Sequence, residues 1–385
     1  MRILFIADGR SPTAINWIRH FTERGDEVTL ISSSYAQPDL ALKALHIVPL
    51  GLSNAERATS SNSVLRTPGL VDLRTKVKQW LGPLMVKRKS AQVRRIIEEV
   101  KPELVHAMRI PFEGMVAAEG YSGIPLVISV WGNDFTLHAA SNQYMRYYTE
   151  WALRVAHGLH ADCERDITLA KQLGFDPRKP SLVIPGSGGI RPEIFFPGEN
   201  TEKNPVVINP RGFRAYVQNE TFFKAIPLIL RQIPRAKFIC TGMMGVKQVE
   251  SWIRSLGIGD SVTLMENQSQ KDLANLYRSS MIVVSPTTHD GTPNSLIEAM
   301  ACGCYPVAGD IESIREWIKD GQNGTLVNPL DPQAIADGII QAIQNREGRQ
   351  KAFAVNRTIL AERAYYENGM RKVEAFYAEI TRNTT

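Results

Sequence analysis

The sequence is poor in cysteine and has no long apolar run. Its 385 residues include four cysteines, of which only Cys302 and Cys304 lie close together. Such scattered cysteines make no disulfide framework, and this pair, inside an apolar helix-to-strand passage, is interpreted as small buried side chains rather than metal ligands. No apolar stretch approaches the roughly 20 residues that span a bilayer, and the N-terminal stretch turns polar too early for a signal peptide. We therefore expect a cytoplasmic protein.

Several familiar motifs are also missing. The turn after Ile3–Ala7 lacks G-x-G-x-x-G, which disfavours a non-catalytic dinucleotide-binding module. No Asp-x-Asp pair or His/Cys cluster stands at a predicted cleft position, so we expect no metal and no other cofactor. The net charge is +6, but no nucleic-acid-reading motif accompanies it, so no nucleic-acid partner is expected.

Short apolar runs rich in β-branched residues alternate with helical stretches, which predicts parallel sheets with crossover helices. The first series is Ile3–Ala7, Val28–Ser32, Ile47–Leu50, Leu104–Ala107 and Leu126–Val130. The second series is Val206–Asn209, Lys237–Cys240, Val262–Met265, Ile282–Ser285, Tyr305–Ala308 and Thr325–Val327. The same α/β architecture is thus expected twice, and the length suits two domains of roughly 150–200 residues each.

A Gly-rich stretch, Pro185–Gly189, followed by a polar segment has the composition of a linker. It predicts a first domain over 1–190 and a second over 191–360. The amphipathic tail over 361–385 need not belong to the domain before it.

The segment from Thr288 to Pro306 carries the most chemistry. A strand is expected to end at Ser285, the turn at Gly291 and Thr292 frees backbone amides, and Pro293 suits the first turn of a helix ending at Gly303. A helix start of this kind suits a diphosphate. The candidate donor-binding residues here are Gly291, Thr292, Pro293, Asn294, Ser295 and Glu298. Glu298 can accept hydrogen bonds from a ribose diol, and Asp290, before the helix, is the candidate catalytic group that faces the sugar.

This segment resembles the signature of the family 4 retaining glycosyltransferases, in which two acidic residues bracket seven others and an Ala-Met-Ala-x-Gly-x-Pro-Val type run follows. Asp290 stands where that family usually has Glu, which keeps the charge but shortens the reach. The resemblance implies a GT-B fold: two Rossmann-like, doubly wound parallel-sheet domains facing a cleft. The first domain would hold the acceptor and the second the donor, and a C-terminal helix would cross back to the first.

The resemblance also assigns supporting roles. Arg211 matches the family's pyrophosphate-binding Arg, and Arg214 is the substitute for a Lys that is absent here. Val130–Asp134 resembles the family's His-Gly-Thr-Asp loop beside the reacting sugar, so Asp134 becomes a candidate catalytic residue. His106 fits a polar group at the cleft floor, although a strand-end His is as often structural. The nucleotide base is expected on the loop at Glu266.

The function so implied is transfer of a hexose-type sugar, with retention, from a nucleotide-diphosphate sugar to a glycan, lipid or small-molecule acceptor. A nucleotide-sugar epimerase or a sugar-phosphate synthase on the same scaffold is the alternative. Residues 74–99 gather basic side chains around an apolar cluster. This segment either contacts an anionic membrane surface peripherally or forms a solvated helix face.

Overall fold

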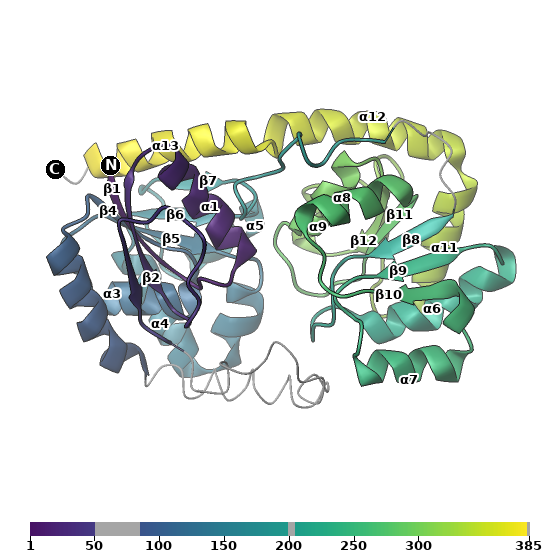
Figure 1. The fold of residues 1–385 in the computed structure, drawn as a ribbon, viewed down its shortest axis with the longest axis horizontal. Coiled ribbons are helices and arrows are strands. Elements are labelled where there is room, and N and C mark those ends of the chain that lie inside the picture. Colours follow the sequence, from purple (N-terminus) through teal and green to yellow (C-terminus); the bar gives the residue numbers. More distant parts are fainter. Residues whose placement is uncertain (51–84, 199–204, 383–385) are drawn as a thin grey trace. The chain divides into compact units, whose positions relative to one another are not determined.

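The computed structural model describes residues 1–50, 85–198 and 205–382. Within these residues the chain forms two compact units: unit 1 comprises 1–50, 85–189 and 367–382, and unit 2 comprises 190–198 and 205–366 (Figure 1). The predicted domain boundaries were 190 and 360. The second predicted boundary, 360, lies before the end of unit 2 at Tyr366. The reason is that residues 361–363 still complete the long helix α12 (Arg346–Arg363) of unit 2.

Unit 1 is built on a seven-stranded parallel sheet with the order β3-β2-β1-β4-β5-β6-β7. Its strands are β1 (Arg2–Ala7), β2 (Glu27–Ser32), β3 (Ala44–Ile47), β4 (Leu104–Ala107), β5 (Leu126–Val130), β6 (Gly158–Ala161) and β7 (Ser181–Val183). Strands β1 and β2 are buried at every position after the first. Strands covered on both faces read as continuous apolar runs, which is why the sequence predicted them closely.

The helices of unit 1 cover both faces of this sheet. They are α1 (Pro12–Glu23), the helical residues 85–100, α3 (Met115–Glu119), α4 (Gln143–Val155), α5 (Glu164–Gln172) and α13 (Tyr366–Arg382), with short turns η3 (Ile110–Gly114), η4 (Asp134–His138) and η5 (Ala139–Ser141). One apolar core joins the helix over 85–100, α3 and α4 to alternate residues of the strands, such as Leu4 and Ile6. These three helices therefore lie on the same face of the sheet.

The C-terminal helix α13 packs on unit 1, as the GT-B expectation requires. The ring of Tyr377 stacks on Phe21 of α1 with centroids 5.1 Å apart, and Trp17 Nε1 donates to Tyr377 Oη at 3.0 Å. Gly158 lies directly under this helix, and a Cβ there would force the ends of the Ile380 and Phe376 side chains to shift. The chain thus returns, after the whole of unit 2, to the face of the sheet that α1 covers.

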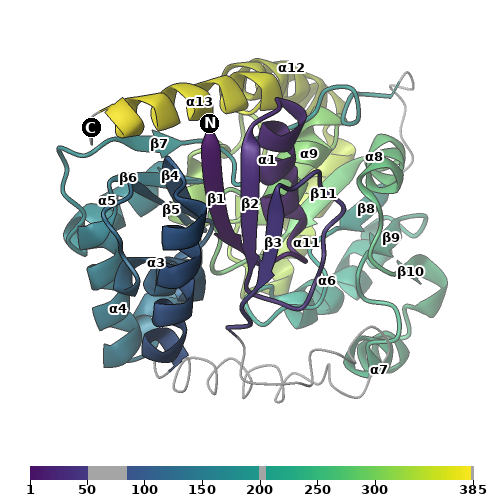
Figure 2. The ribbon, with the colours of Figure 1, turned by 60° about the vertical axis from the view of Figure 1, so that its left-hand side comes forward.

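Unit 2 is built on a six-stranded parallel sheet with the order β10-β9-β8-β11-β12-β13. Its strands are β8 (Val206–Asn209), β9 (Lys237–Cys240), β10 (Val262–Leu264), β11 (Ile282–Ser285), β12 (Tyr305–Gly309) and β13 (Thr325–Val327). Its helices are α6 (Asn219–Gln232), α7 (Lys247–Leu256), α8 (Gln270–Ser279), α9 (Asn294–Ala301), α10 (Glu312–Arg315), α11 (Pro332–Gln344) and α12, with the turn η6 (Gly259–Ser261). Both units are therefore the doubly wound parallel-sheet domains predicted from the sequence (Figure 2).

The position of one predicted strand needs correction, and two strands were not predicted. The strand predicted at Ile47–Leu50 is β3, and it lies earlier, over Ala44–Ile47. Every residue of β3 is only half-buried at the sheet edge, so apolar character did not mark its position. Strands β6 and β7 were not predicted, because β6 contains Gly158 and His160 and β7 has three residues.

Candidate active site

The strand order of unit 2 fixes where its ligand site lies. The order reverses between β8 and β11, and in open parallel sheets ligands bind beyond the carboxyl ends of the strands at this point. Strand β8 leads directly to Arg211, and β11 leads to the turn that contains Asp290. The two segments singled out in the sequence are therefore neighbours in space, although about 80 positions separate them along the chain.

Arg211 joins the two segments. Its Nη2 forms an ion pair with Asp290 Oδ2, and its Nη1 donates to Ser295 Oγ at 3.1 Å. The guanidinium is 8% exposed, and its Nε is buried without a hydrogen-bond partner within the described part of the chain. A buried cation held between a carboxylate and the first turn of a helix can bind a second anion.

The turn before α9 is held by residues far along the chain. Ser313 Oγ donates to the backbone oxygen of Asp290 at 2.7 Å, and Trp317 Nε1 donates to Thr292 Oγ1 at 2.8 Å. Pro293 is the N-cap of α9 rather than its first helical residue, and no side chain caps the helix. Because Pro293 has an extended backbone, the helix begins one residue later than predicted, and a helix start without an N-cap side-chain hydrogen bond suits an anion.

The C-terminal end of α9 also lies slightly earlier in the sequence than predicted. The helix runs to Ala301, with Cys302 as its C-cap, and Gly303 follows with φ of 83°. Gly303 thus ends the helix in the left-handed conformation that glycine adopts readily. The predicted glycine stop therefore lies just outside the helix.

Glu298 lies inside α9 and is half-buried. Burial raises the pKa of Glu298 from 4.5 to about 7, and the positive charge of Arg211 opposes that rise. A carboxyl group with this pKa exchanges its proton near neutral pH, and its oxygens can accept hydrogen bonds from a diol when it is ionised.

The remaining donor-site residues lie on the loops around this centre. Arg214 is exposed, and its Nη1 donates to Tyr216 Oη at 2.8 Å. Glu266 is exposed beyond β10, and its backbone oxygen accepts from Gly242 N at 3.2 Å. The structure therefore brings Asp290, Ser295 and Arg211 into direct contact, whereas Arg214 and Glu266 are exposed on loops of unit 2.

Sequence reasoning missed several polar groups of this site. The hydroxyls of Ser285 and Thr287, at the end of β11, are buried and have no hydrogen-bond partner within the described residues. Asn219 of α6 donates to Gly212 O at 3.1 Å and so fixes the loop that carries Arg211. The position of Ser285 and Thr287 directly before the acidic motif could have marked them, whereas no local signal pointed to Asn219, Ser313 or Trp317.

In unit 1, Asp134 is fully buried and ties two loops together. Its carboxylate accepts from Arg109 Nε at 2.9 Å and from the backbone amides of Trp131 and Ile110 at 3.1 and 3.4 Å. Burial raises the pKa of Asp134, and Arg109 opposes the rise. Since Asp134 has 0% exposed surface, its observed contacts are those of a residue that positions the loop after β5.

His106 is also fully buried in unit 1. Its Nδ1 is hydrogen-bonded to Tyr377 Oη, and its Nε2 to Ser129 Oγ at 2.7 Å. The same Ser129 hydroxyl bonds His160 Nδ1 at 2.8 Å. With no exposed surface and both ring nitrogens bonded, His106 has the contacts of a structural residue, the alternative left open by the sequence. We therefore leave it out of the proposed catalytic set.

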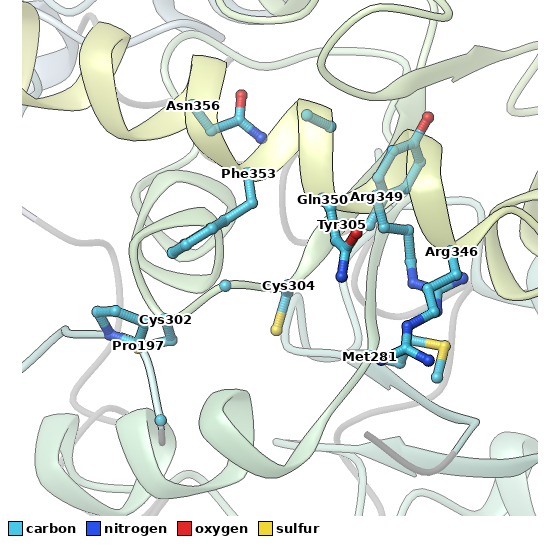
Figure 3. Close-up of a pocket in the computed structure, with 13 residues that line it drawn as sticks. Pro197, Met281, Cys302, Cys304, Tyr305, Arg346, Arg349, Gln350, Phe353 and Asn356 are labelled. Atoms are coloured by element: carbon cyan, nitrogen blue, oxygen red, sulfur yellow. The ribbon is translucent and has the colours of Figure 1, made fainter. Parts of the chain in front are cut away.

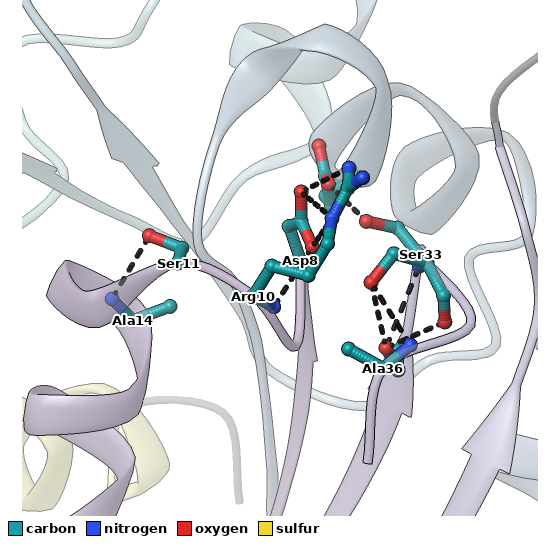
Figure 4. A network of polar contacts seen from close by, with 9 residues as sticks. Asp8, Arg10, Ser11, Ala14, Ser33 and Ala36 are labelled. Carbon is teal, nitrogen blue, oxygen red and sulfur yellow. Dashed lines mark hydrogen bonds and ion pairs between the residues drawn. The ribbon is translucent and has the colours of Figure 1, made fainter. Parts of the chain in front are cut away.

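The turn after β1 is closed by charged contacts of its own. Arg10 donates from Nε and Nη2 to the two carboxylate oxygens of Asp8, and Ser11 caps α1 by accepting from Ala14 N at 3.3 Å (Figure 4). There is little space around Gly9 for a side chain, because a Cβ there would lie 2.7 Å from Ser32 Oγ. The turn after β1 is thus closed by charged and polar contacts and does not form an open glycine loop.

Two other features lie away from these residues. A cavity of about 130 Å³ lies beyond the C-terminal end of α9 and is lined by residues such as Cys302, Phe353 and Arg346, so it does not include Asp290 or Glu298 (Figure 3). The only group of potential metal ligands found among the described residues is Asp162, Cys163 and Asp166. Arg165 already donates to Asp166 at 2.7 Å, so a guanidinium occupies one side of that cluster.

Two family models match the chain. The model described as "Glycosyl transferases group 1" matches residues 190–356, and the model described as "Glycosyl transferase 4-like" matches residues 2–162. Curated relatives include a D-inositol 3-phosphate glycosyltransferase of Mycobacterium bovis and one of Mycobacterium tuberculosis, each 29% identical over 177 residues. That match covers 43% of this chain and only 36% of the length of each relative.

Solved structures show the same fold over the whole chain. The crystal structure of Anabaena Alr3699/HepE in complex with UDP and glucose is 17% identical, has a TM-score of 0.72, and covers 98% of this chain and 100% of that one. Sucrose-phosphate synthase from Thermosynechococcus elongatus is 12% identical with a TM-score of 0.74, and the match covers 100% of both chains. The solved structures show that the fold is GT-B, and the two family models, which together match residues 2–162 and 190–356, show that the chain belongs to the family 4 glycosyltransferases.

Proposed function

We propose that this protein is a retaining glycosyltransferase that moves a hexose-type sugar from a nucleotide-diphosphate sugar to a glycan, lipid or small-molecule acceptor without a metal. The contact that carries the proposal is Arg211, which joins Asp290 to Ser295 at the uncapped start of α9. A cation and a helix start together suit a diphosphate, and metal-independent transfer needs positive charge there. The relatives' name supports glycosyl transfer, and the UDP bound to Anabaena HepE supports a nucleotide-sugar donor.

The ion pair of Arg211 with Asp290 suggests how donor binding prepares the site. The diphosphate would compete with Asp290 for Arg211 and free the Asp290 carboxylate to face the sugar. Glu298 would hold the ribose diol, while the backbone amides of Gly291, Thr292 and Asn294 would donate to the phosphates. Arg214 and Glu266 would close the site from the rim, at the phosphates and the base.

In the reaction the acceptor oxygen forms a bond to the anomeric carbon on the face from which the diphosphate leaves. The bond from that carbon to the diphosphate oxygen breaks, and the acceptor proton passes to the departing diphosphate. Arg211 and the start of α9 would stabilise the growing negative charge. Unit 1 would hold the acceptor, with Asp134 keeping the loop after β5 in place through Arg109.

A donor panel is the direct test of this function. UDP-, GDP- and ADP-hexoses are compared by thermal shift, and the anomeric configuration of the product is read by NMR after an acceptor is added. Binding of one nucleotide sugar and a product with the donor's configuration are expected. Conversion of a nucleotide sugar without any acceptor would show the alternative, an epimerase, and an inverted product would refute retention.

We further propose a cytoplasmic location with peripheral membrane contact. No helix in the described part of the chain has the length and apolar character to cross a membrane. Residues 74–84 of the predicted membrane segment lie outside the described residues, whereas 85–99 belong to a helix of unit 1. Fractionation of cells into soluble and membrane parts, with and without a high-salt wash, tests this location.

A further inference from the structure

Three aromatic side chains gather on the outer side of α4. Tyr144, Tyr147 and Trp151 are 62%, 60% and 38% exposed. Their spacing of three and four positions places them along one side of the helix, over a length of about 10 Å. They are three of the nine large hydrophobic side chains that are exposed among the described residues, so this exposure is concentrated rather than scattered. We call these three residues the aromatic stripe.

The stripe is flanked by positive charge. Arg146 and Arg154 are exposed on the same helix and share one acid, since both form ion pairs with Glu150, at 2.9 and 3.4 Å. The exposed side of α4 therefore carries two cations and one anion beside its aromatic rings. Tyrosine, tryptophan and arginine combine an apolar body with a polar end, which is the chemistry that suits the headgroup layer of a bilayer.

The helix over 85–100 adds further positive charge on the same side of unit 1. Its buried positions include Val86, Val93 and Ile97, and they belong to the core that also contains the buried face of α4. Arg88 and Arg95 are exposed and lie on the opposite side of that helix. Because both helices cover one face of the sheet, their outer sides both point away from it.

The distribution of charge along the chain points to an anionic partner for this surface. Within the described helix over 85–100 five basic side chains face two acidic ones, a net charge of +3, which is half of the net charge of the whole chain; they are Lys87, Arg88, Lys89, Arg94 and Arg95, with Glu98 and Glu99. One helix of unit 1 thus concentrates much of the excess positive charge. A patch that combines concentrated positive charge with aromatic side chains is complementary to a membrane with anionic lipids.

We propose that unit 1 docks on an anionic lipid surface through the aromatic stripe, with Arg88 and Arg95 providing electrostatic attraction. The stripe would enter the headgroup layer, and the arginines would lie against the lipid phosphates. This docking deepens the peripheral contact proposed above by naming the residues that make it. It does not depend on the transfer reaction, so it can be measured without a donor or an acceptor.

The test is flotation of the full-length protein with vesicles of phosphatidylcholine alone or mixed with phosphatidylglycerol. Wild-type protein is expected to bind the mixed vesicles and to dissociate as salt rises. The variant Y144S/Y147S/W151S should bind at least about tenfold more weakly. The variant R88Q/R95Q should bind roughly 20-fold more weakly, with a reduced preference for the anionic lipid.

A matched control replaces three exposed apolar residues of unit 2 by serine, as M244S/L330S/V355S, and should bind like wild type. Thermal unfolding of each variant shows whether it is folded, and nucleotide-sugar binding reports on the donor site separately. Wild-type protein that ignores the mixed vesicles would overturn the proposal, and a stripe that recognises a protein partner instead would give this result. Equal losses in the control and the stripe variant would overturn it as well.

Discussion

Replacing Glu298 with glutamine tests the electrostatics of the donor site while changing its shape little. Burial raises the pKa of Glu298 from 4.5 to about 7. The folded state therefore holds this proton more tightly than the unfolded chain does. The stability that follows is fully present below pH 4.5 and is lost as pH rises to about 7. A pKa rise of this size corresponds to a change of roughly 3 kcal/mol in the free energy of unfolding between low and high pH. Partial solvent screening reduces this change to about 2 kcal/mol.

Glutamine never ionises, so Glu298→Gln should stabilise unit 2 by about 2 kcal/mol near pH 8 and by little near pH 5. The variant should at the same time lose most of its transfer activity, because the ribose diol loses its carboxylate acceptor. Amide hydrogen exchange in peptides covering β11 and β12 reads the stability of unit 2 separately from unit 1. Glu266→Gln, at an exposed position of the same unit, is the control and should show no such pH dependence.

The reasoning would be refuted if Glu298→Gln were equally stabilising at both pH values, or destabilising near pH 8. Either result would mean that desolvation does not dominate the energetics of this carboxyl group. Retained transfer activity would contradict the ribose role without touching the stability argument. The two readouts therefore separate the electrostatic claim from the functional one.

Three further predictions concern other parts of the molecule. Asp290→Asn should lower the transfer rate at least about 100-fold yet bind UDP slightly more tightly in calorimetry, because Arg211 loses its competing anion; weaker UDP binding would contradict this. Gly309→Ala should destabilise unit 2 by about 2 kcal/mol or more in denaturant titrations, since a Cβ would lie 2.4 Å from the Thr287 backbone oxygen, and an unchanged midpoint would disprove the close approach. Burial lowers the pKa of His160 from 6.5 to about 4, so unit 1 should lose stability as pH falls through this range, and His160→Gln should reduce that dependence in pH-resolved unfolding.

Much of the fold could be read from the sequence because its strands are buried on both faces. Strands such as β4, β5 and β11 occupy the predicted residues without change, since parallel strands between two helix layers are uniformly apolar. The edge strand β3 was predicted three residues too late along the chain. One side of an edge strand faces solvent, so its side chains need not be apolar and do not mark its position. Local pattern therefore predicted the centre of each sheet better than its edge.

The candidate donor site was partly predictable for a related reason. Asp290, the turn and Glu298 lie within one short segment, so their spacing along a turn and a helix follows from local geometry. Their supports do not: Trp317 and Ser313 reach the turn from more than 20 positions away. The pairing of Arg211 with Asp290 required a position at the carboxyl ends of two neighbouring strands, which the sequence indicated only through the expected sheet order.

His106 shows the opposite case. Its place at the end of a buried strand was correctly predicted, yet the strand alone could not tell whether its ring would face a ligand or the interior. That was decided by α13, which is 271 positions further along the chain at Tyr377 and covers the ring.

The sequence by itself determined the two doubly wound sheets, the family and the helix start that suits a diphosphate, because hydrophobic period and turn chemistry act over a few residues. Only the tertiary structure decided which charged groups meet, which are buried and which surface stays exposed. Those properties depend on contacts between distant segments: Arg211 gained its partner, His106 lost its access to solvent, and the aromatic stripe of α4 remained uncovered among the described residues through packing that no local pattern encodes.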